Sequence, residues 1–453
     1  MNKTVEAATL DVQSYIDGQR FTPYQWLIVL LGFLIVAVDG FDTAAIGYIA
    51  PSLVQEWGVS KSMLGPVLSA ALFGLAIGGL AGGPVADRLG RKLVLVASVF
   101  FFGVWSLVSA YATTLESLTV FRFLTGLGLG AAMPNAVTLM AEFSPKRIRS
   151  VLVNTVFCGM PLGASAGGFL ASWLIPAYGW RAVLIVGGLT PVILSVFLIL
   201  LLPESVRFLV ARRKPAEKIR KIIRRIFNEN FAAVSAFTSD EPHHIDTKTA
   251  VGVVFSPEYR LGTAMLWAAY FFGLVIIYLL INWMPLILKD SGFSIGRAAF
   301  VSALFTLGGG IGAVFSGWMM GKFNSNKVVA AAFVLSGLLI VAVGQSIGNT
   351  FWLGILIFIM GVAMNGAQSS MPSLATEFYP TRGRATGVAW MMGIGRLGGI
   401  TGALFGAELM RRQLGFDQIF TILAFPAFVA AGALIVKCLA VRLDARAEAA
   451  ALP

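Results

Sequence analysis

The sequence predicts an all-α membrane protein in which twelve spanning helices form two bundles of six. Three observations support this prediction. The chain has 453 residues, of which 57% are hydrophobic and 12% are charged, and that charged share is about half of what a soluble domain carries. Twelve apolar runs approach or exceed the roughly 20 residues that a spanning helix needs. A segment near the end of the fourth run recurs near the end of the tenth.

The apolar runs and the polar stretches between them divide the chain into five regions. The expected spans are 26–50, 62–85, 92–111, 115–141, 150–175, 181–202, 260–288, 297–320, 327–347, 350–375, 384–409 and 416–439. The longest polar interruption separates six spans from six. The expected regions are a polar tail (1–25), a first six-helix bundle (26–202), a central loop (203–259), a second six-helix bundle (260–439) and a C-terminal tail (440–453).

The two halves repeat one another. Residues 142–150 read EFSPKRIRS and residues 377–385 read EFYPTRGRA, with five identical positions at an offset of 235. Both copies follow a span that has the same place in its half. Two related bundles in one membrane chain are typical of carriers that bind their substrate between the halves, near the middle of the bilayer.

The placement of basic residues predicts the orientation. With twelve spans both termini lie on one side, and that side carries 26 of the 34 Lys and Arg residues, whereas the opposite loops carry six. Basic residues accumulate in cytoplasmic loops, so we expect both termini in the cytoplasm. The net charge of +12 therefore reflects topology and gives no reason to expect nucleic acid as a partner. The basic run 207–225 is expected to be a charged helix near anionic lipid.

Two carboxylates interrupt the first span. Asp39 and Asp42 are three residues apart and so lie on one helix face. Ionisable residues at bilayer depth usually mark an ion or substrate pathway. The chain has two histidines, His243 and His244, both in a polar stretch, so a proton crossing the membrane would have to bind a carboxylate. The alternative is a pair at the membrane interface that only marks a helix end.

Two arginines lie within or at the edge of spans. Arg122 is in the fourth span, where it could pair with a first-span carboxylate. The alternative is an arginine whose side chain extends to the interface. Arg396 lies deep in the eleventh span among glycines and could grip a substrate carboxylate with two parallel hydrogen bonds. Its alternative is a pairing with Glu408 or with water at the helix edge.

A charged loop, GPVADRLGRK (83–92), joins the second and third spans. Gly83 would permit a close helix contact, Gly90 a tight turn, and Asp87 could meet helix termini and arginines of the neighbouring bundle. The second half reads GWMMGKFNSNK at the equivalent place, with Gly321 where the aspartate would be. We therefore expect this contact to be asymmetric between the halves.

The loop, together with RFLTGLGLGAAMPN in the fourth span and DGFDTAAIGYIAP in the first, resembles the aromatic acid:proton symporter family of the major facilitator superfamily. DVQSYI, PESVRFLV and the segment 365–399 extend the resemblance along nearly the whole chain. It implies proton-coupled uptake of aromatic carboxylates, such as 4-hydroxybenzoate or protocatechuate, across the bacterial inner membrane. It also implies that the loop is a latch that holds the outward-open state.

The residues and the resemblance together give three groups of expected site residues. Those expected to couple protons are Asp39, Asp42 and Arg122. Those expected to contact substrate are Arg396, Asn135, Asn282, Asn365, Gln368 and Trp390. Those expected to act in gating are Gly83, Asp87, Arg88, Gly90, Arg91, Glu142, Arg147, Glu377, Arg382 and Arg384.

Other functions fit the sequence less well. A sugar carrier would leave Arg396 without a role, and a proton antiporter is favoured only by the partial motif CGMPLGASAGG (158–168). A carrier of another organic anion stays open. A membrane sensor would need an output domain, and an enzyme would need a nucleotide-binding loop or a metal cluster. We expect a monomer whose partners are the substrate and the bilayer, with no cofactor or metal other than the transported protons.

Overall fold

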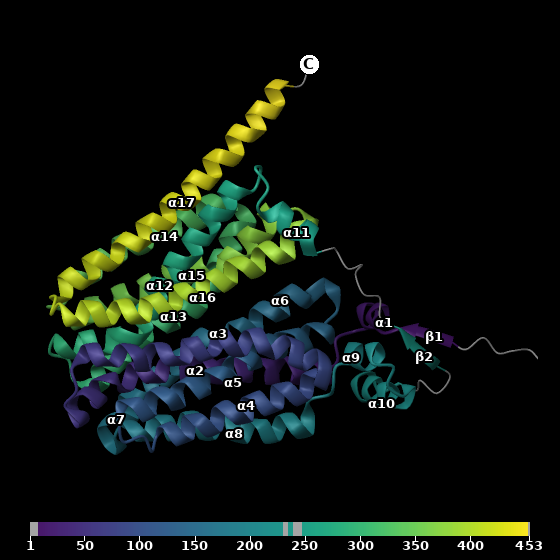
Figure 1. Ribbon diagram of the computed structural model, residues 1–453, viewed down its shortest axis with the longest axis horizontal. Coiled ribbons are helices and arrows are strands. Elements are labelled where there is room, and N and C mark those ends of the chain that lie inside the picture. Colours follow the sequence, from purple (N-terminus) through teal and green to yellow (C-terminus); the bar gives the residue numbers. More distant parts are fainter. Residues whose placement is uncertain (1–7, 230–233, 239–246, 452–453) are drawn as a thin grey trace, which may run out of the picture.

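The computed structural model describes residues 8–229, 234–238 and 247–451, and their long helices form two bundles (Figure 1). Twelve helical segments are long and apolar enough to span a membrane, which confirms the predicted fold class. The N half holds α2 (Pro23–Trp57), α3 (Leu64–Leu89), α4 (Arg91–Ser109), α5 (Leu115–Glu142), α6 (Lys146–Phe157), α7 (Gly159–Tyr178) and α8 (Trp180–Leu201). The C half holds α12 (Arg260–Asp290), α13 (Ile295–Lys322), α14 (Ser325–Gly344), α15 (Thr350–Phe378), α16 (Thr381–Arg411) and α17 (Phe416–Ala451).

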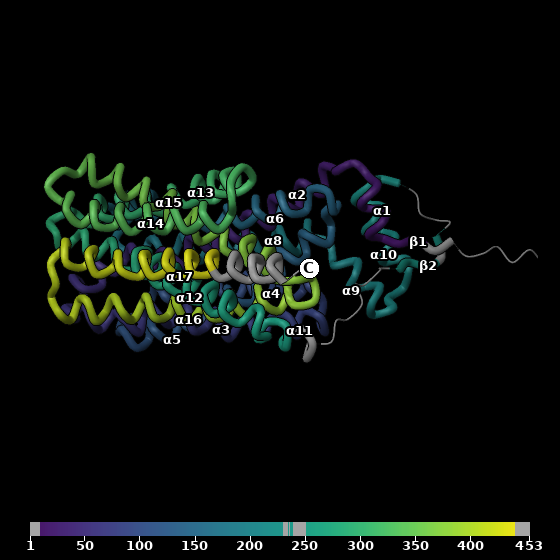
Figure 2. The backbone as a smooth tube through the Cα atoms, turned by 90° about the horizontal axis from the view of Figure 1, so that it is seen from above, coloured from purple at the N-terminus to yellow at the C-terminus, as the bar shows by residue number. Residues whose placement is uncertain are grey.

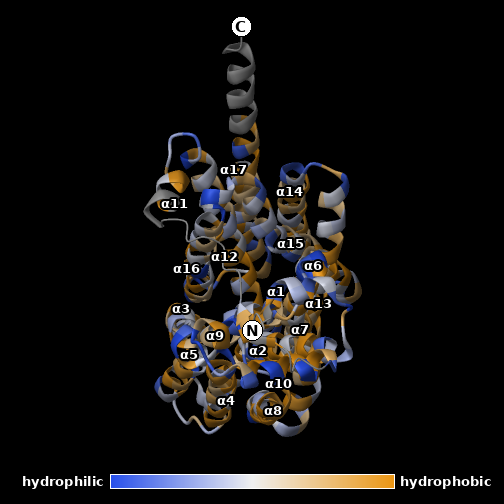
Figure 3. Cartoon of the chain, turned by 90° about the vertical axis from the view of Figure 1, so that its right-hand side faces the viewer, coloured by the Kyte–Doolittle hydropathy of each residue, from blue (hydrophilic) through white to orange (hydrophobic). Residues whose placement is uncertain are grey.

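The two ends of the bundles differ. The tail end, at which α2 begins, carries further short elements and lies on the right of Figure 1, and the far end is the one at which α2 ends. Figure 3 is seen from the tail end and shows apolar residues along the outer faces of the spanning helices. Such faces suit contact with lipid hydrocarbon, and the chain is a multi-pass membrane protein.

Glycines bring pairs of helices into backbone contact, in the same way in each half. A Cβ atom on Gly126 of α5 would overlap the carbonyl oxygen of Ala71 on α3. In the C half a Cβ atom on Gly361 of α15 would overlap the carbonyl oxygen of Phe305 on α13. Small residues let membrane helices approach closely and gain van der Waals contact. The repeat seen in the sequence is therefore also a repeat of packing.

The predicted fifth span is broken. The sequence predicted one helix over 150–175, but α6 ends at Phe157 and α7 begins at Gly159, with Cys158 between them. Pro161 explains the break, because its ring lacks an N–H and collides with the carbonyl group four residues earlier in a regular helix. The break lies against α2, where a Cβ atom on Gly159 would meet the carbonyl oxygen of Phe33 at 2.7 Å.

The two polar regions fold against each other at the tail end. The N-terminal elements β1 (Ala8–Asp11) and α1 (Val12–Gly18) lie beside α9 (Val206–Ala211), α10 (Ala216–Phe227) and β2 (Val234–Thr238) of the central loop (Figure 2). Strands β1 and β2 pair in parallel. The basic run 207–225, expected as one helix, is two helices because Pro215 caps the second. Helix α11 (Thr247–Val254) follows, and His243 and His244 lie outside the described residues.

Helix α1 is anchored to the N half through Asp17. The carboxylate accepts a hydrogen bond from the backbone N–H of Lys146 at 2.8 Å and another from the Gln13 amide at 2.9 Å. Burial alone would raise the pKa of Asp17, but these hydrogen bonds and the Lys146 ammonium group lower the pKa on balance. The cap formed by the two polar regions is thus tied to the start of α6.

The halves are joined most firmly at the far end. Lys61, in the 3-10 helix η1 (Lys61–Met63), forms an ion pair of 2.7 Å with Asp290 of the C half. A Cβ atom on Gly65 would lie 2.8 Å from the Cβ atom of Ala407. Among the residues that the structure describes, no hydrogen bond or ion pair joins the halves at the tail end. Among the described residues, a polar contact therefore holds the halves together at the far end and none does so at the tail end.

This arrangement predicts that a disulfide between Gly65→Cys and Ala407→Cys will form and will block transport. The two Cβ atoms need to separate by about 1 Å to reach the usual disulfide spacing of about 3.8 Å. The chain would be freed of Cys158 and Cys438, oxidised, and assayed for uptake before and after a reducing agent is added. If the fully oxidised protein takes up substrate at the wild-type rate, the far end does not need to open during transport.

Candidate functional site

A buried ion pair connects three helices of the N half. Asp42 on α2 and Arg122 on α5 are both fully buried, with their closest nitrogen and oxygen 2.8 Å apart. The guanidinium group donates Nη1–H to Oδ1 at 3.0 Å and Nη2–H to Oδ2 at 2.8 Å. Ser106 on α4 donates a further hydrogen bond to Oδ1 at 2.7 Å. Arg122 is therefore a partner of the first-span carboxylate, and the alternative of an interfacial arginine is excluded.

Asp39 lies one turn earlier on the same helix but has far fewer partners. The residue is 1% exposed, so the alternative of an interfacial aspartate is also excluded. Its Oδ1 accepts a long hydrogen bond of 3.3 Å from Thr43, and its Oδ2 has no hydrogen-bond partner among the described residues. A lone carboxylate costs much more to bury than a neutral carboxylic acid. Asp39 therefore has the surroundings of a group that gains and loses a proton.

Arg396 reaches from the C half to the N half. Its Nη1 lies 3.5 Å from the carbonyl oxygens of Leu75 and Ala76 on α3. No carboxylate within ion-pair distance faces Arg396 in the described part of the chain. Glu408, its alternative partner, is paired with two arginines of the far end. The charge of Arg396 is thus held near mid-span by neutral carbonyl groups.

Two tyrosines of α12 flank Arg396. The ring of Tyr270 lies against Gly395, and the ring of Tyr278 lies against Gly399, where a Cβ atom would come within 2.8 Å of it. These glycines let the rings lie flat on α16, one on each side of Arg396 along that helix. Neither hydroxyl group makes a hydrogen bond with the residues described. Asp39, Arg396, Tyr270 and Tyr278 all lie near the middle of their helices, and these four residues are named here the central cluster.

The other residues expected to contact substrate lie at different places in the structure. Asn282 is buried on α12, where its backbone faces Gly47 of the N half. Gln368 donates a hydrogen bond of 3.2 Å to the carbonyl oxygen of Tyr270, behind the central cluster. Asn365 donates to the carbonyl oxygen of Gly361 on its own helix at 3.1 Å. These residues lie beside or behind the cluster, and their contact with substrate stays a prediction.

Asn135 and Trp390, two of the expected substrate contacts, contact other groups of their own half. The Asn135 amide donates to the carbonyl oxygen of Ala131 at 2.8 Å, between α3 and α5. Trp390 is 44% exposed and stacks on Trp267 with the ring centroids 6.0 Å apart. Phe255 packs edge-on against both rings. In this arrangement both residues pack within one half, and their contact with substrate stays a prediction.

The charged segment 83–92, expected as a loop, is the last part of α3, a turn at Gly90 and the start of α4, and its side chains bond within the N half. Arg91 forms an ion pair of 3.0 Å with Glu142, which also accepts a hydrogen bond from Ser205. The Asp87 side chain is 69% exposed and lies 3.6 Å from Arg91. Arg212 of the cap donates to the carbonyl oxygen of Asp87 at 2.9 Å. No described residue of the C half forms an ion pair with the Asp87 carboxylate, so the expected contact between the halves is not made in this arrangement.

Of the two glycines singled out in the segment 83–92, one has the expected role and the other does not. Gly90 has a φ of +106°, which confirms the tight turn. A Cβ atom on Gly83 would meet no atom within 4 Å, whereas one on Gly82 would meet Ala131 of α5 at 2.8 Å. The close helix contact is therefore made by Gly82, and the expectation for Gly83 was wrong for this arrangement. Residue types alone could not tell which of two adjacent glycines faces the neighbouring helix.

The repeated motif has the same geometry in both halves. Arg149 donates from Nη2 to the carbonyl oxygen of Ser144 at 3.0 Å, and Arg384 donates from Nε to that of Tyr379 at 3.4 Å. Each arginine thereby closes the turn that precedes its own helix. The remaining arginines of the expected gate have exposed side chains, and these are Arg88, Arg147 and Arg382.

The carboxylates of the two copies differ in their partners. Glu142 is buried and pairs with Arg91, whereas Glu377 is exposed and accepts a hydrogen bond of 3.1 Å from Ser325. A hydroxyl group thus stands where the first half has a guanidinium group. The two copies therefore differ in this contact within each half, and the asymmetry expected for a contact between the halves stays a prediction.

Sequence reasoning missed several polar partners of these groups. Ser106 completes the site of Asp42, and Glu204 accepts a hydrogen bond from the backbone N–H of Lys92 at 3.0 Å. Ser205 bonds Glu142. Serines in apolar helices usually bond their own backbone, so Ser106 gave no signal in the sequence. The segment PESVRFLV contained the other two residues, but its role at the tail end depends on contacts with distant parts of the chain.

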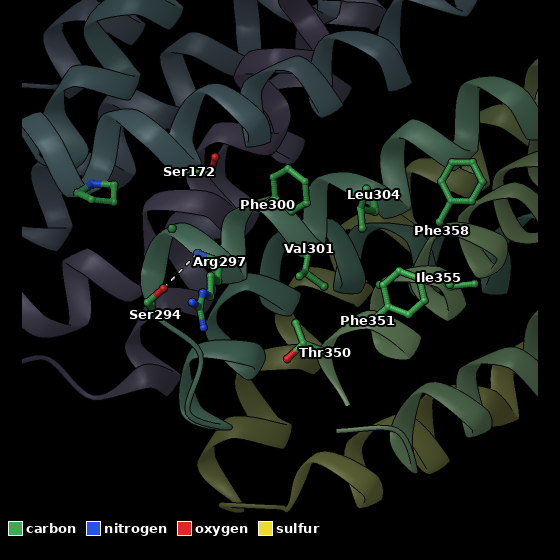
Figure 4. Close-up of a pocket in the computed structure, with 13 residues that line it drawn as sticks. Ser172, Ser294, Arg297, Phe300, Val301, Leu304, Thr350, Phe351, Ile355 and Phe358 are labelled. Carbon is green, nitrogen blue, oxygen red and sulfur yellow. Dashed lines mark hydrogen bonds between the residues drawn. The ribbon is translucent and has the colours of Figure 1, made fainter. Parts of the chain in front are cut away.

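A separate hollow lies away from the central cluster. It has a volume of about 780 Å³ and is lined by residues of α7, α13 and α15 near the far end (Figure 4). The described residues form no group of three or more His, Cys, Asp or Glu side chains that could hold a metal ion. The buried charges, and not this hollow, mark the candidate site.

The comparisons with known proteins agree with this fold. The Major Facilitator Superfamily model matches residues 32–300 and 266–451. The 4-hydroxybenzoate transporter of Pseudomonas aeruginosa is 51% identical over 436 residues, which cover 96% of this chain and 97% of that protein. The gallate transporter of Pseudomonas putida is 47% identical over 428 residues, which cover 94% of this chain and 95% of that protein.

Solved structures share the fold. The crystal structure of a D-xylose–proton symporter has a TM-score of 0.70 at 19% identity and covers 91% of this chain and 97% of that one. The xylose transporter from E. coli in an inward-open conformation has the same TM-score and identity and covers 90% of this chain and 95% of that one. The relatives are transporters, and they confirm the resemblance found in the sequence and the prediction that the chain is not an enzyme.

The geometry predicts different effects of removing the two first-span carboxylates. Asp42→Asn leaves the Arg122 guanidinium group buried without a counter-charge, which typically costs about 3–5 kcal/mol. Asp39→Asn removes no ion pair. The purified Asp42→Asn protein should therefore melt at a clearly lower temperature, whereas Asp39→Asn should melt near the wild type.

A double variant provides the control for this prediction. Asp42→Leu combined with Arg122→Met removes both charges and should regain most of the lost stability, because replacing a whole buried pair by apolar side chains is often neutral. An Asp42→Asn protein that melts like the wild type would show that this pair does not stabilise the bundle.

Proposed function

This chain belongs to the Major Facilitator Superfamily, and from that premise we propose that it imports small aromatic carboxylates together with protons. The named relatives carry 4-hydroxybenzoate and gallate, and we propose the same class of substrate, with 4-hydroxybenzoate or protocatechuate first. The proposed place is a bacterial inner membrane, with both termini in the cytoplasm. The tail end is then the cytoplasmic end, and the arrangement described above faces inward.

One observation carries the proposal. Asp39 of the N half and Arg396 of the C half are charged groups near the middle of their spans, and Arg396 reaches α3 of the N half. Neither has an ion-pair partner among the described residues. A pathway for a proton and an anion needs a site for each. Asp39 can hold the proton, and Arg396 can bind the substrate carboxylate with two hydrogen bonds.

The two sites are coupled by their charges. When Asp39 is ionised, its negative charge attracts Arg396 and repels an incoming carboxylate. Protonation of Asp39 removes that repulsion and leaves Arg396 free for the substrate. Such a coupling is reciprocal, so bound substrate must raise the proton affinity of Asp39 by the same factor. The pair Asp42–Arg122 is proposed to stay ionised throughout and to hold Asp39 at the face of the C half.

The tyrosines are proposed to bind the ring. Tyr270 and Tyr278 lie on either side of Arg396 along α16, with hydroxyl groups free of hydrogen bonds to the described residues. An aromatic ring gains from offset or edge-on contact with such rings. The solved structures that share the fold are of xylose carriers, but an identity of 19% shows only that the fold is common to them and this chain. A sugar carrier would have no need of an arginine at this place.

Asp39→Asn should abolish accumulation driven by a pH gradient, because an amide cannot carry the proton. Proteoliposomes containing the purified protein would be given labelled 4-hydroxybenzoate with an acid exterior. Wild type should accumulate the label, Asp39→Asn should only equilibrate it, and the exposed Asp417→Asn should behave as wild type. Substrate affinity should rise as pH falls in wild type and stay constant in Asp39→Asn. Accumulation by Asp39→Asn at the wild-type level would refute this assignment of the proton site.

Arg396→Ala should lose measurable binding of 4-hydroxybenzoate while the protein stays folded, because no carboxylate is left unpaired. Removing one partner of a desolvated charged hydrogen-bonded pair costs about 2–5 kcal/mol, and about 2.8 kcal/mol is a hundredfold in affinity. Arg396→Lys should restore binding only in part. Binding of the neutral 4-hydroxybenzamide, measured by calorimetry, should hardly change. Wild-type affinity of the alanine variant for the acid would assign Arg396 a structural role.

A further inference from the structure

The hollow near the far end has the shape and position of a lateral groove between the halves. Ser172 and Pro176 come from α7 of the N half, and the rest of the lining comes from α13 and α15 of the C half (Figure 4). Its apolar walls are Phe300, Val301, Leu304, Phe351, Ile355 and Phe358. The groove therefore follows the seam along which the halves meet.

Two residues of the apolar walls face outward from the bundle, whereas Val301 is buried. Phe300 is 48% exposed and Phe351 is 71% exposed. In a chain of twelve spans, exposed aromatic side chains along α13 and α15 meet the hydrocarbon of the bilayer rather than water. The molecule that fills this groove in the membrane must then have an apolar chain.

A cation without a partner lies at the mouth of the groove. Six basic residues belong to the far end, and four of them, Lys61, Arg181, Arg411 and Arg412, form ion pairs with carboxylates. Arg297 and Lys289 form none with the described residues, and only Arg297 lines the groove. Arg297 lies in the first turn of α13, where the positive end of the helix dipole also favours an anion. The charge at the mouth is complementary to a phosphate group.

We propose that this groove binds an anionic phospholipid from the membrane leaflet at the far end. The phosphate group would lie at Arg297 and the start of α13, and one acyl chain would run along Phe300 toward Phe358. The groove is bordered by the seam contacts, where Gly296 packs on the carbonyl group of Ser172 and Phe169 packs on Phe300 at 5.1 Å. A lipid seated there contacts both halves and stabilises the arrangement closed at the far end.

The test measures lipid retained by the purified full chain. The protein is delipidated, mixed with phosphatidylglycerol or phosphatidylcholine of the same acyl chains, and examined by native mass spectrometry. Wild type should retain phosphatidylglycerol preferentially. Arg297→Gln should lower this retention about fivefold, the effect expected of one basic residue at an anionic surface. Lys289→Gln is the matched control, because it removes an unpaired cation of the same end outside the groove, and it should retain lipid like wild type.

A second variant tests the apolar wall independently of charge. A Cβ atom on Gly354 would meet only the end of the Leu304 side chain, at 3.3 Å, so Gly354→Leu should fill the groove without disturbing the backbone. This variant should lose retention of phosphatidylglycerol with Arg297 intact. Equal retention of both lipids by wild type, or wild-type retention by Arg297→Gln, would overturn the proposal. If Arg297→Gln instead loses binding of labelled 4-hydroxybenzoate and keeps lipid, the groove is an entry site for substrate.

Discussion

The ion pair between Asp42 and Arg122 is the interaction on which the arrangement of the N half depends. A charge within the bilayer needs a partner, and this pair gives each charge one while joining α2 to α5. Ser106 adds α4 to the same site. Both carboxylate oxygens of Asp42 have partners, whereas Nε of Arg122 has none among the described residues. The neighbouring Asp39, one turn away on the same helix, is the carboxylate that has few partners.

Close packing inside each half allows the halves to move as units. Glycines place helix backbones in contact at α3 with α5 and at α13 with α15, and such contacts tolerate little sliding. The halves also meet through glycines, since a Cβ atom on Gly47 would overlap the carbonyl oxygen of Ile281. The polar contacts between the described residues of the two halves are few, with one ion pair at the far end and Arg396 on α3 near mid-span. A change of access that separates the far end would break Lys61 from Asp290 and leave both halves intact.

The sequence predicted the parts of this structure that periodicity and composition govern. The twelve spans, the repeat, the turn at Gly90 and the pairing of Arg122 with a first-span carboxylate could all be anticipated. The pairing of β1 with β2 could not, because it joins segments more than 200 residues apart. Nor could the direction of the Asn135 and Trp390 side chains, since a helix offers a polar or aromatic side chain several faces and the choice depends on neighbours from other spans.

The charged residues of the candidate site are distributed unequally between the two halves of the repeat. Gly163 packs on the carbonyl group of Ala37 in the N half, and Gly398 packs on that of Phe271 in the C half, which fixes the correspondence of positions. The charged positions Asp39, Asp42 and Arg122 correspond to Gly273, Ile276 and Ile357, and Arg396 corresponds to Pro161. Each charge of the site thus has an uncharged counterpart. The N half carries the two carboxylates, and the C half carries Arg396, the arginine of the site that has no ion-pair partner among the described residues. A proton bound at mid-membrane would therefore belong to the N half and a bound anion to the C half. Closing the halves around both would bring the bound charges together.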